Sequence, residues 1–340
     1  MEITTILCER VDQAKQSSCI VVGIVDKTGS KTVSYGHFSY TDNNPADGDT
    51  VFEIGSATKV FTGLLLADMV KRGEVRLNDP ISRYLPKSVR VPVRNSQPIT
   101  LLDLATHTSG LPRLPDNFAP TNMDNPYAEY TLEQLYAFIS DYTLTRDIGS
   151  EYEYSNLGAG LLGHILALKS DTDYETVLLR RICLPLGMTH TRITLSSDMK
   201  ARLAPGHNTE GQPVANWDIS TFAGAGALRS TANNLLKFLA ANLGLTKSDL
   251  WPAVQLAQKP RRNAGSQDTD VGLCWHILKK FGTVLIWHNG GTGGYHSFIG
   301  INPQTKRGVV VLANSANSTD DIGFHLLEAN YPLSRPQPVR

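Results

Sequence analysis

The sequence predicts an α+β fold in which strands from both ends of the chain form one antiparallel sheet and a mostly helical region is inserted between them. Apolar runs typical of strands lie at residues 19–40 and return at 271–315, whereas apolar positions between them follow a helical spacing. We therefore expect a sheet region of residues 1–75 and 266–340, flanked by helices, a helical region of residues 76–265, and a functional cleft between the two.

The N-terminal elements are predicted from local patterns. Residues 3–16 place apolar side chains at helical spacing, which indicates an amphipathic helix. The apolar run 19–27 and the alternating run 31–40 are separated by Thr-Gly-Ser and predict a β-hairpin. A longer helix begins at Ser56 and is expected to end near Gly73.

The middle of the chain alternates helical patterns with loops rich in Pro and Asn, and the β pattern then returns before a last amphipathic helix. No internal repeat interrupts this order. The predicted helices span 131–140, 157–168, 174–186, 231–245 and 319–329, and the predicted C-terminal strands span 271–280, 283–291, 295–303 and 308–315.

Composition excludes several classes of function. The chain of 340 residues is long enough for a large core, and its 32 basic and 32 acidic side chains argue against a nucleic-acid partner. The four cysteines are scattered without a CxxC pair, and no histidines stand at metal-ligand spacing, so we expect no disulfide framework and no metal. The GxGxxG match at 158–163 lies inside a helical pattern, so we expect no cofactor either.

The N-terminal segment gives an expectation about location. Charged residues such as Glu2, Glu9 and Arg10 interrupt it, so it lacks the apolar core of a secretory signal. No apolar stretch reaches the length of a membrane span. We expect no membrane span and a cytoplasmic protein as the sequence stands, or a periplasmic or secreted one if a leader has been removed. The oligomeric state stays open.

Ser56 and Lys59 form an SxxK motif at the start of the predicted helix. A serine hydroxyl needs a neighbouring base, and residues three apart share a helical face. Free N–H groups at the helix start also favour a developing oxyanion. The alternative is that Ser56 only caps the helix, because the motif is short enough to recur by chance at Ser197 and Lys200. We expect Lys59 to lie outside the core.

Two further triplets carry polar groups suited to acyl transfer. Tyr154 and Asn156 form a YxN motif, in which a tyrosine phenolate could shuttle a proton if cations lowered its pKa. The alternative is an ordinary turn tyrosine before a helix. His288-Asn289-Gly290 ends an apolar strand and opens a glycine-rich run, where a substrate backbone could approach the strand edge. Its alternative is a simple hairpin turn.

The order SxxK, YxN and HxG resembles that of the serine β-lactamase and penicillin-binding protein superfamily. The likeness is greatest to the branch of class C β-lactamases, D-alanyl-D-alanine carboxypeptidases and esterases, and extends over about residues 15–330. The resemblance implies a β-lactamase-like fold. It also implies a serine hydrolase that acts on β-lactams, D-amino-acid peptides or esters, with small molecules or short peptides as its partners.

The resemblance also implies roles for the motif residues. Ser56 is expected to be the acylated nucleophile, Lys59 and Tyr154 to handle its proton, and Asn156 to contact the amide of the acyl group.

The third motif is expected to form the docking strand. His288, Asn289 and Gly290 would line the strand that binds substrate, and the backbone N–H groups of Ser56 and Gly291 would form the oxyanion hole.

The third motif departs from the usual class C pattern. Class C β-lactamases usually carry Lys-Thr-Gly, and His288 replaces that lysine with a group that is mostly neutral at pH 7. This difference resembles the carboxypeptidases and esterases of the branch. The alternative function is a sensor that β-lactams acylate at Ser56 without turnover.

Two features near the motifs have competing interpretations. The segment 117–127 is either a mobile lip of the substrate cleft or a passive surface loop. His107 is interpreted as part of a structural loop packed under the site, because no GxSxG elbow surrounds the neighbouring Ser109.

Overall fold

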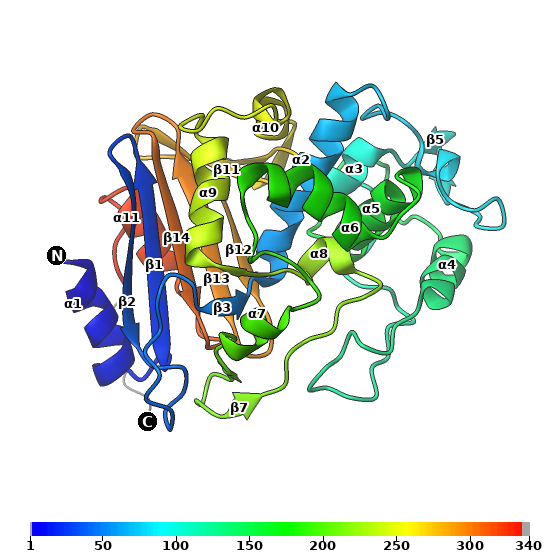
Figure 1. The fold of residues 1–340 in the computed structure, drawn as a ribbon. Helices are drawn as coiled ribbons and strands as arrows, with labels where there is room; N and C mark the ends of the chain where they lie inside the picture. Colours follow the sequence, from blue (N-terminus) through cyan, green and yellow to red (C-terminus); the bar gives the residue numbers. More distant parts are fainter. Residues whose placement is uncertain (1, 335–340) are drawn as a thin grey trace.

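The computed structural model describes residues 2–334. In this part of the chain one eight-stranded antiparallel sheet has the order β2-β1-β14-β13-β12-β11-β10-β9 (Figure 1). Its strands are β1 (Cys19–Asp26), β2 (Gly29–Gly36), β9 (Arg262–Ser266), β10 (Thr269–Val271), β11 (His276–Lys280), β12 (Thr283–Gly291), β13 (His296–Asn302) and β14 (Arg307–Ala313).

The sheet joins the two ends of the chain through β1 and β14. Residues 20–25 of β1 pair in register with residues 308–313 of β14, while the other edge of β1 pairs with β2. The sequence predicts this assembly, although β9 begins at Arg262, slightly before the predicted region boundary.

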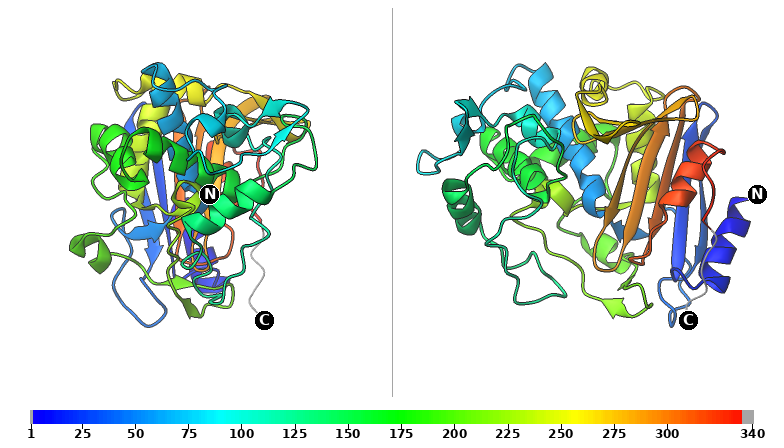
Figure 2. Two further views of the ribbon diagram at one scale, coloured as in Figure 1. Left: turned by 90° about the vertical axis from the view of Figure 1, so that its right-hand side faces the viewer. Right: turned by 180° about the vertical axis from the view of Figure 1, so that it is seen from behind.

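Helices cover both faces of the sheet (Figures 1 and 2). Helices α1 (Ile3–Cys8) and α11 (Asp320–Leu327) pack on one face, and α9 (Ala232–Asn242) packs on the other. Alternate β1 residues therefore enter two separate apolar clusters: Val21 lies in one, and Ile20 in the other. Because both faces are buried, the strand reads as a continuous apolar run.

The other helices lie mainly beside the sheet, on the right in Figure 1. They are α2 (Thr58–Lys71), α3 (Leu101–Ala105), α4 (Leu132–Asp141), α5 (Asn156–Lys169), α6 (Tyr174–Leu178), α7 (Ser197–Ala201), α8 (Ala223–Gly226) and α10 (Trp251–Ala257). Small two-stranded sheets pair β3 (Val51–Glu53) with β8 (Arg229–Thr231), β4 (Val93–Arg94) with β5 (Gln97–Pro98), and β6 (Gly206–His207) with β7 (Pro213–Val214). Short 3-10 turns occupy Gly55–Ala57, Ile81–Arg83 and Leu184–Leu186, and π-helical turns occupy Glu9–Gln13 and Leu179–Cys183.

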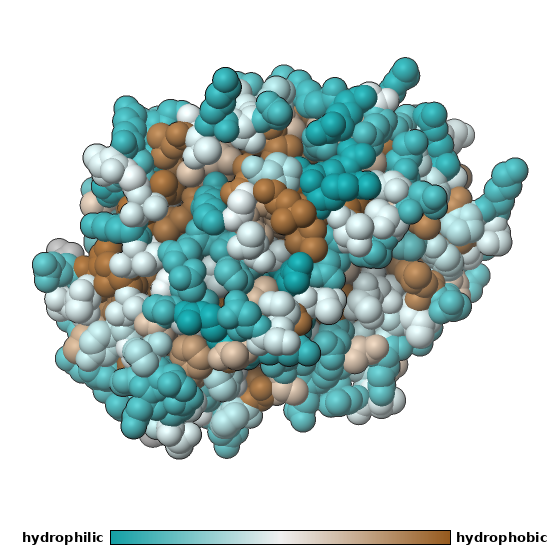
Figure 3. Space-filling view, in the orientation of Figure 1, coloured by the Kyte–Doolittle hydropathy of each residue, from teal (hydrophilic) through white to brown (hydrophobic). Residues whose placement is uncertain are grey.

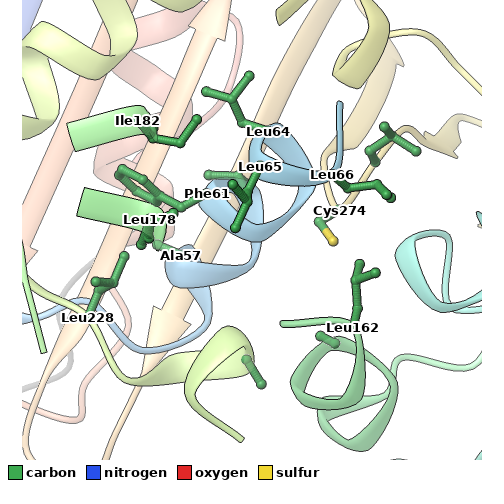
Figure 4. Packing of buried hydrophobic residues seen from close by; sticks show 14 of the residues in the cluster. Ala57, Phe61, Leu64, Leu65, Leu66, Leu162, Leu178, Ile182, Leu228 and Cys274 are labelled. Atoms are coloured by element: carbon green, nitrogen blue, oxygen red, sulfur yellow. The ribbon is translucent and has the colours of Figure 1, made fainter. Parts of the chain in front are cut away.

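Helix α2 runs through the centre of the larger core. Its residues from Thr58 to Met69 are buried on every side of the helix, which is typical of a core helix and not of an amphipathic surface helix. In Figure 4, Phe61 points toward Leu178 and Ile182, while Leu162 on α5 lies on another side of α2. This packing fixes the N-terminal end of α2, which carries the SxxK motif.

Two predicted strand boundaries are wrong. The first hairpin turns at residues 27–28 and not at Thr-Gly-Ser, because the Asp26 carboxylate accepts the Thr28 N–H and starts β2 at Gly29. The expected strand 271–280 is broken after β10, since Cys274 has a positive φ of 63° and its N–H donates to the Ala105 carbonyl near the end of α3.

The surface seen in the orientation of Figure 1 is largely hydrophilic, with apolar side chains in small separate patches (Figure 3). Among the helices within residues 2–334, none has both the length and the hydropathy that crossing a membrane requires.

Candidate active site

Ser56 lies in the 3-10 turn Gly55–Ala57 directly before α2, so the α-helix begins two residues later than the sequence suggested. No side chain caps this turn or α2, which excludes the interpretation of Ser56 as a simple helix cap. Gly55 has a φ of +48°, and an added Cβ would lie 2.8 Å from the Gly291 carbonyl oxygen. Glycine is therefore required where this turn meets β12.

Lys59 is fully buried, with 0% of its surface exposed, so the expectation that it lies outside the core is wrong. Its Nζ donates to three acceptors: Ser56 Oγ at 2.9 Å, Asn156 Oδ1 at 2.8 Å and the Ala225 carbonyl at 2.7 Å. The lysine is tolerated in the core because each N–H of the ammonium finds a partner.

Burial lowers the pKa of Lys59 to about 7, and the nearby charge of Arg113 contributes in the same direction. A neutral amine has two N–H donors and one lone pair. The Asn156 Oδ1 and Ala225 carbonyl oxygens can only accept, so they take the two donors. The lone pair is then left facing the Ser56 hydroxyl, which can donate its proton to it.

The YxN segment meets the SxxK motif at the start of α5. Ser155 is the N-cap of α5, and its Oγ accepts the Gly158 N–H at 2.8 Å. This cap holds its two neighbours in place: Asn156 contacts Lys59, and the Tyr154 ring centroid lies 4.8 Å from Lys59 Nζ. The segment is therefore both a turn before a helix and a site motif, because this turn presents the side chains of Tyr154 and Asn156 to Lys59.

The phenol of Tyr154 is held in its neutral form. Burial raises the pKa of Tyr154, and this effect outweighs the opposing effects of a hydrogen bond with Ser56 and of the charge on Arg113. The phenolate suggested by the sequence is therefore disfavoured at neutral pH. Lys59 is the group near Ser56 whose pKa suits a base.

Strand β12 presses against the Ser56 turn through Gly290. A Cβ at Gly290 would lie 1.9 Å from the Ile54 carbonyl oxygen and 2.8 Å from the Ser56 backbone nitrogen. His288, two residues earlier on the same face, lies with its ring 6.0 Å from the Tyr154 ring. The three sequence motifs therefore meet at one place.

The side chain of Asn289 is not part of this cluster. Successive side chains of a strand point to opposite faces, and Asn289 Nδ2 donates to Asp320 Oδ2 on α11 at 2.7 Å. Only the backbone of Asn289 remains at the edge of β12 near the site.

The backbone of Gly291 faces an open strand edge. Thr292 N–H donates to the Tyr295 carbonyl, and the alternation of an antiparallel ladder then directs the Gly291 N–H away from β13. On that side β11 pairs with β12 only as far as Trp287. The Gly291 N–H is therefore directed to the same side as a substrate docked on this edge, and Gly291 and Ser56 line one pocket.

Three buried imidazoles surround Tyr154. The His107 ring centroid lies 4.7 Å from the ring of Tyr154, and those of His276 and His288 lie 6.3 and 6.0 Å away. Burial lowers the pKa of His276 to about 4 and holds the pKa values of His107 and His288 well below their usual range. All three rings are therefore neutral at pH 7, and His107 packs under the site as the sequence suggested.

The pocket beside Ser56 has largely apolar walls that no sequence motif identified. The Tyr127 and Trp217 ring centroids lie 5.4 Å apart, and Phe222 and Ile219 line the same pocket. Tyr127 belongs to the segment 117–127, which therefore contributes a wall of the pocket. The sequence points to this segment as one of two alternatives, but it does not single out Tyr127, because one aromatic residue in an irregular loop follows no period.

Arg113 is the other residue that the motifs missed. Its guanidinium carbon lies 5.2 Å from the ring centroid of Tyr154, and its side chain is exposed. In residues 2–334, no cluster of three or more His, Cys, Asp or Glu side chains is arranged to hold a metal ion.

Comparison with known proteins identifies the family. The Beta-lactamase family matches residues 7–328 of the chain. AmpH of Escherichia coli (strain K12), a D-alanyl-D-alanine-carboxypeptidase/endopeptidase, is 31% identical over 325 residues, which cover 89% of this chain and 83% of AmpH. A β-lactamase of the same strain is 26% identical over 317 residues, covering 83% and 80% of the two chains.

The fold comparison agrees. The crystal structure of a class C β-lactamase from Rhodobacter sphaeroides superposes with a TM-score of 0.80 at 25% identity, covering 93% of this chain and 95% of that one. The predicted fold class and the predicted superfamily are both confirmed. The chain belongs to the Beta-lactamase family.

Proposed function

We propose that this protein is a serine hydrolase that forms an acyl-enzyme on Ser56 and releases the acyl group to water. Its family implies this type of activity, and the carboxypeptidase and β-lactamase relatives suggest D-amino-acid peptides or β-lactams as substrates. Esters are included because the same acyl transfer to Ser56 would cleave them. The observation that carries the proposal is the fully buried Lys59 Nζ, 2.9 Å from Ser56 Oγ, with a pKa lowered to about 7.

Acylation begins with proton transfer from Ser56 to the neutral amine of Lys59. The Ser56 Oγ then forms a bond to the substrate carbonyl carbon, and the carbonyl oxygen becomes an oxyanion facing the N–H groups of Ser56 and Gly291. Tyr154, a neutral phenol beside Ser56 and Lys59, donates its proton to the leaving group as the carbonyl–leaving-group bond breaks. The proton on Lys59 returns to Tyr154.

Deacylation repeats the sequence with water in place of Ser56. A water molecule transfers its proton through Tyr154 to Lys59 and attacks the acyl ester. The bond to Ser56 Oγ then breaks as that oxygen takes the proton from Lys59, which becomes neutral again. Asn156 serves by holding Lys59 in place through its Oδ1, and its Nδ2 faces the pocket beside Tyr127. The substrate chain docks against the open edge of β12.

Turnover and adduct formation test the proposal together. The protein is incubated with a chromogenic cephalosporin and with p-nitrophenyl acetate or butyrate, while product release and protein mass are both followed. We expect steady turnover of at least one substrate, lost in Ser56→Ala and kept in Ser197→Ala, whose hydroxyl lies on the exposed helix α7.

Two outcomes would contradict the proposal. One stoichiometric β-lactam adduct on Ser56 without turnover would show that the protein binds β-lactams covalently and does not hydrolyse them. Equal activity of the wild type and Ser56→Ala would remove Ser56 from the reaction.

A further inference from the structure

We propose that Arg113 binds a carboxylate of the substrate, so that the enzyme prefers acyl donors carrying a carboxylate near the scissile bond. This inference rests on the proposed acyl-Ser56 mechanism. It assigns the charge of the substrate group that the site recognises. The three motifs leave this charge open, because His288 stands where class C β-lactamases usually have a lysine.

The backbone of Arg113 is fixed to the catalytic segment. Its carbonyl accepts the N–H groups of Asn156 at 3.0 Å and Leu157 at 3.2 Å, and the preceding Pro112 carbonyl accepts the Ser155 hydroxyl at 2.6 Å. These bonds hold the residue against the first turn of α5. The side chain is thus positioned with respect to Tyr154 by the same turn that presents Tyr154.

The guanidinium of Arg113 is free to bind a ligand. It lies over the Tyr154 ring and is exposed, and in residues 2–334 it makes no hydrogen bond or ion pair. Neighbouring arginines are different, since Arg146 pairs with Glu153 and Arg94 pairs with Asp147 at 2.7 Å. Stacking on an aromatic face leaves the N–H groups at the guanidinium rim available for the two oxygens of a carboxylate.

The groups around Tyr154 supply no competing fixed charge. His107, His276 and His288 are buried and neutral, and Lys59 must itself be neutral to act as the base. Arg113 contributes a guanidinium, a cation whose planar N–H groups match a carboxylate. Its charge is close enough to act on the buried groups, because it lowers the pKa values of both Lys59 and Tyr154. A substrate carboxylate docked beside Tyr154 would therefore meet Arg113.

A matched pair of substrates tests the inference. Two aryl esters of the same acyl group are compared, one with a carboxylate on its phenol leaving group and the other with that carboxylate methylated. In Arg113→Met, which keeps an unbranched stem over Tyr154, we expect the ratio of kcat/KM values (charged over neutral ester) to fall about tenfold or more. The neutral ester corrects for any general effect of the lost charge on Lys59.

Two further variants complete the experiment. Arg113→Lys should restore part of the preference, and added salt should weaken it in the wild type. Arg94→Met removes an arginine that is already paired, and should leave the ratio unchanged. Equal losses for the two esters in Arg113→Met would overturn the inference while leaving acyl transfer intact. Failure of the wild type to turn over either ester would instead count against the proposed function.

Discussion

The chain contains the SxxK pattern twice, and the two copies have opposite surroundings. Ser56 and Lys59 precede and begin a helix buried on every side, and their side chains are hydrogen-bonded to each other at 2.9 Å. Ser197 and Lys200 lie on the short helix α7, where both side chains are exposed and the cap is supplied by the neighbouring Ser196.

The difference between the copies lies in burial and not in spacing. Both pairs can share a helical face, but only at Lys59 does the loss of water lower the pKa of the amine into the range of a base at neutral pH. The core residues around α2 therefore contribute to catalysis indirectly. They exclude water from Lys59, which lowers its pKa, and they hold its three acceptors in place. Each prediction below alters one feature that separates the two copies.

The largest effect is expected from removing the buried amine. Lys59→Met should lower the rate of Ser56 acylation by about 10³-fold, because no other group near Ser56 has a pKa suited to take its proton. The mass of the intact protein measures acylation, and circular dichroism checks that the variant is folded. The matched variant Lys200→Met should acylate at the wild-type rate. Normal acylation of folded Lys59→Met would mean that burial has not made Lys59 the base.

The next effect comes from the strand that closes on the Ser56 turn. Gly290→Ala should lower kcat/KM by about 10²-fold, since its Cβ would collide with Ile54 and force β12 away from Ser56. Circular dichroism checks that Gly290→Ala remains folded. Wild-type kcat/KM in the folded variant would show that close contact with β12 is not what positions Ser56.

The sequence predicts the secondary structure and the motif residues of this site better than the burial and the distant contacts of those residues. The sheet and the central helix follow from periodicity, and the contact of Ser56 with Lys59 follows from their spacing. The meeting of both with Tyr154 is implied by the family resemblance. Burial of Lys59 could not be predicted, because its acceptors include the carbonyl of Ala225, which is far away in the chain. The same is true of Arg113, whose position over Tyr154 is set by hydrogen bonds to α5 and by no local pattern.

The pH dependence of acylation tests the lowered pKa directly. Lys59 acts as a base only when neutral, so the acylation rate should rise with pH through a midpoint near 7. Well below the midpoint, the rate should drop about tenfold for each pH unit. Single-turnover rates with p-nitrophenyl acetate between pH 5 and 9 give the profile. The surrounding histidines are neutral across the midpoint, so they should add no second step there. A rate that stays flat from pH 5 to 9 would contradict the role of Lys59.

The smallest effect is expected from restoring a lysine at the third motif. His288 is neutral, fully buried and close enough for charge coupling with Lys59, so His288→Lys would place a second cation near the base. Like charges disfavour protonation, and the acidic limb of the acylation profile should therefore move to lower pH by about one unit. The same single-turnover measurement checks this shift, and His288→Gln controls for loss of the imidazole without added charge. If His288→Lys leaves the limb in place, or if His288→Gln moves it equally, a charge at the third motif does not change the pKa of Lys59.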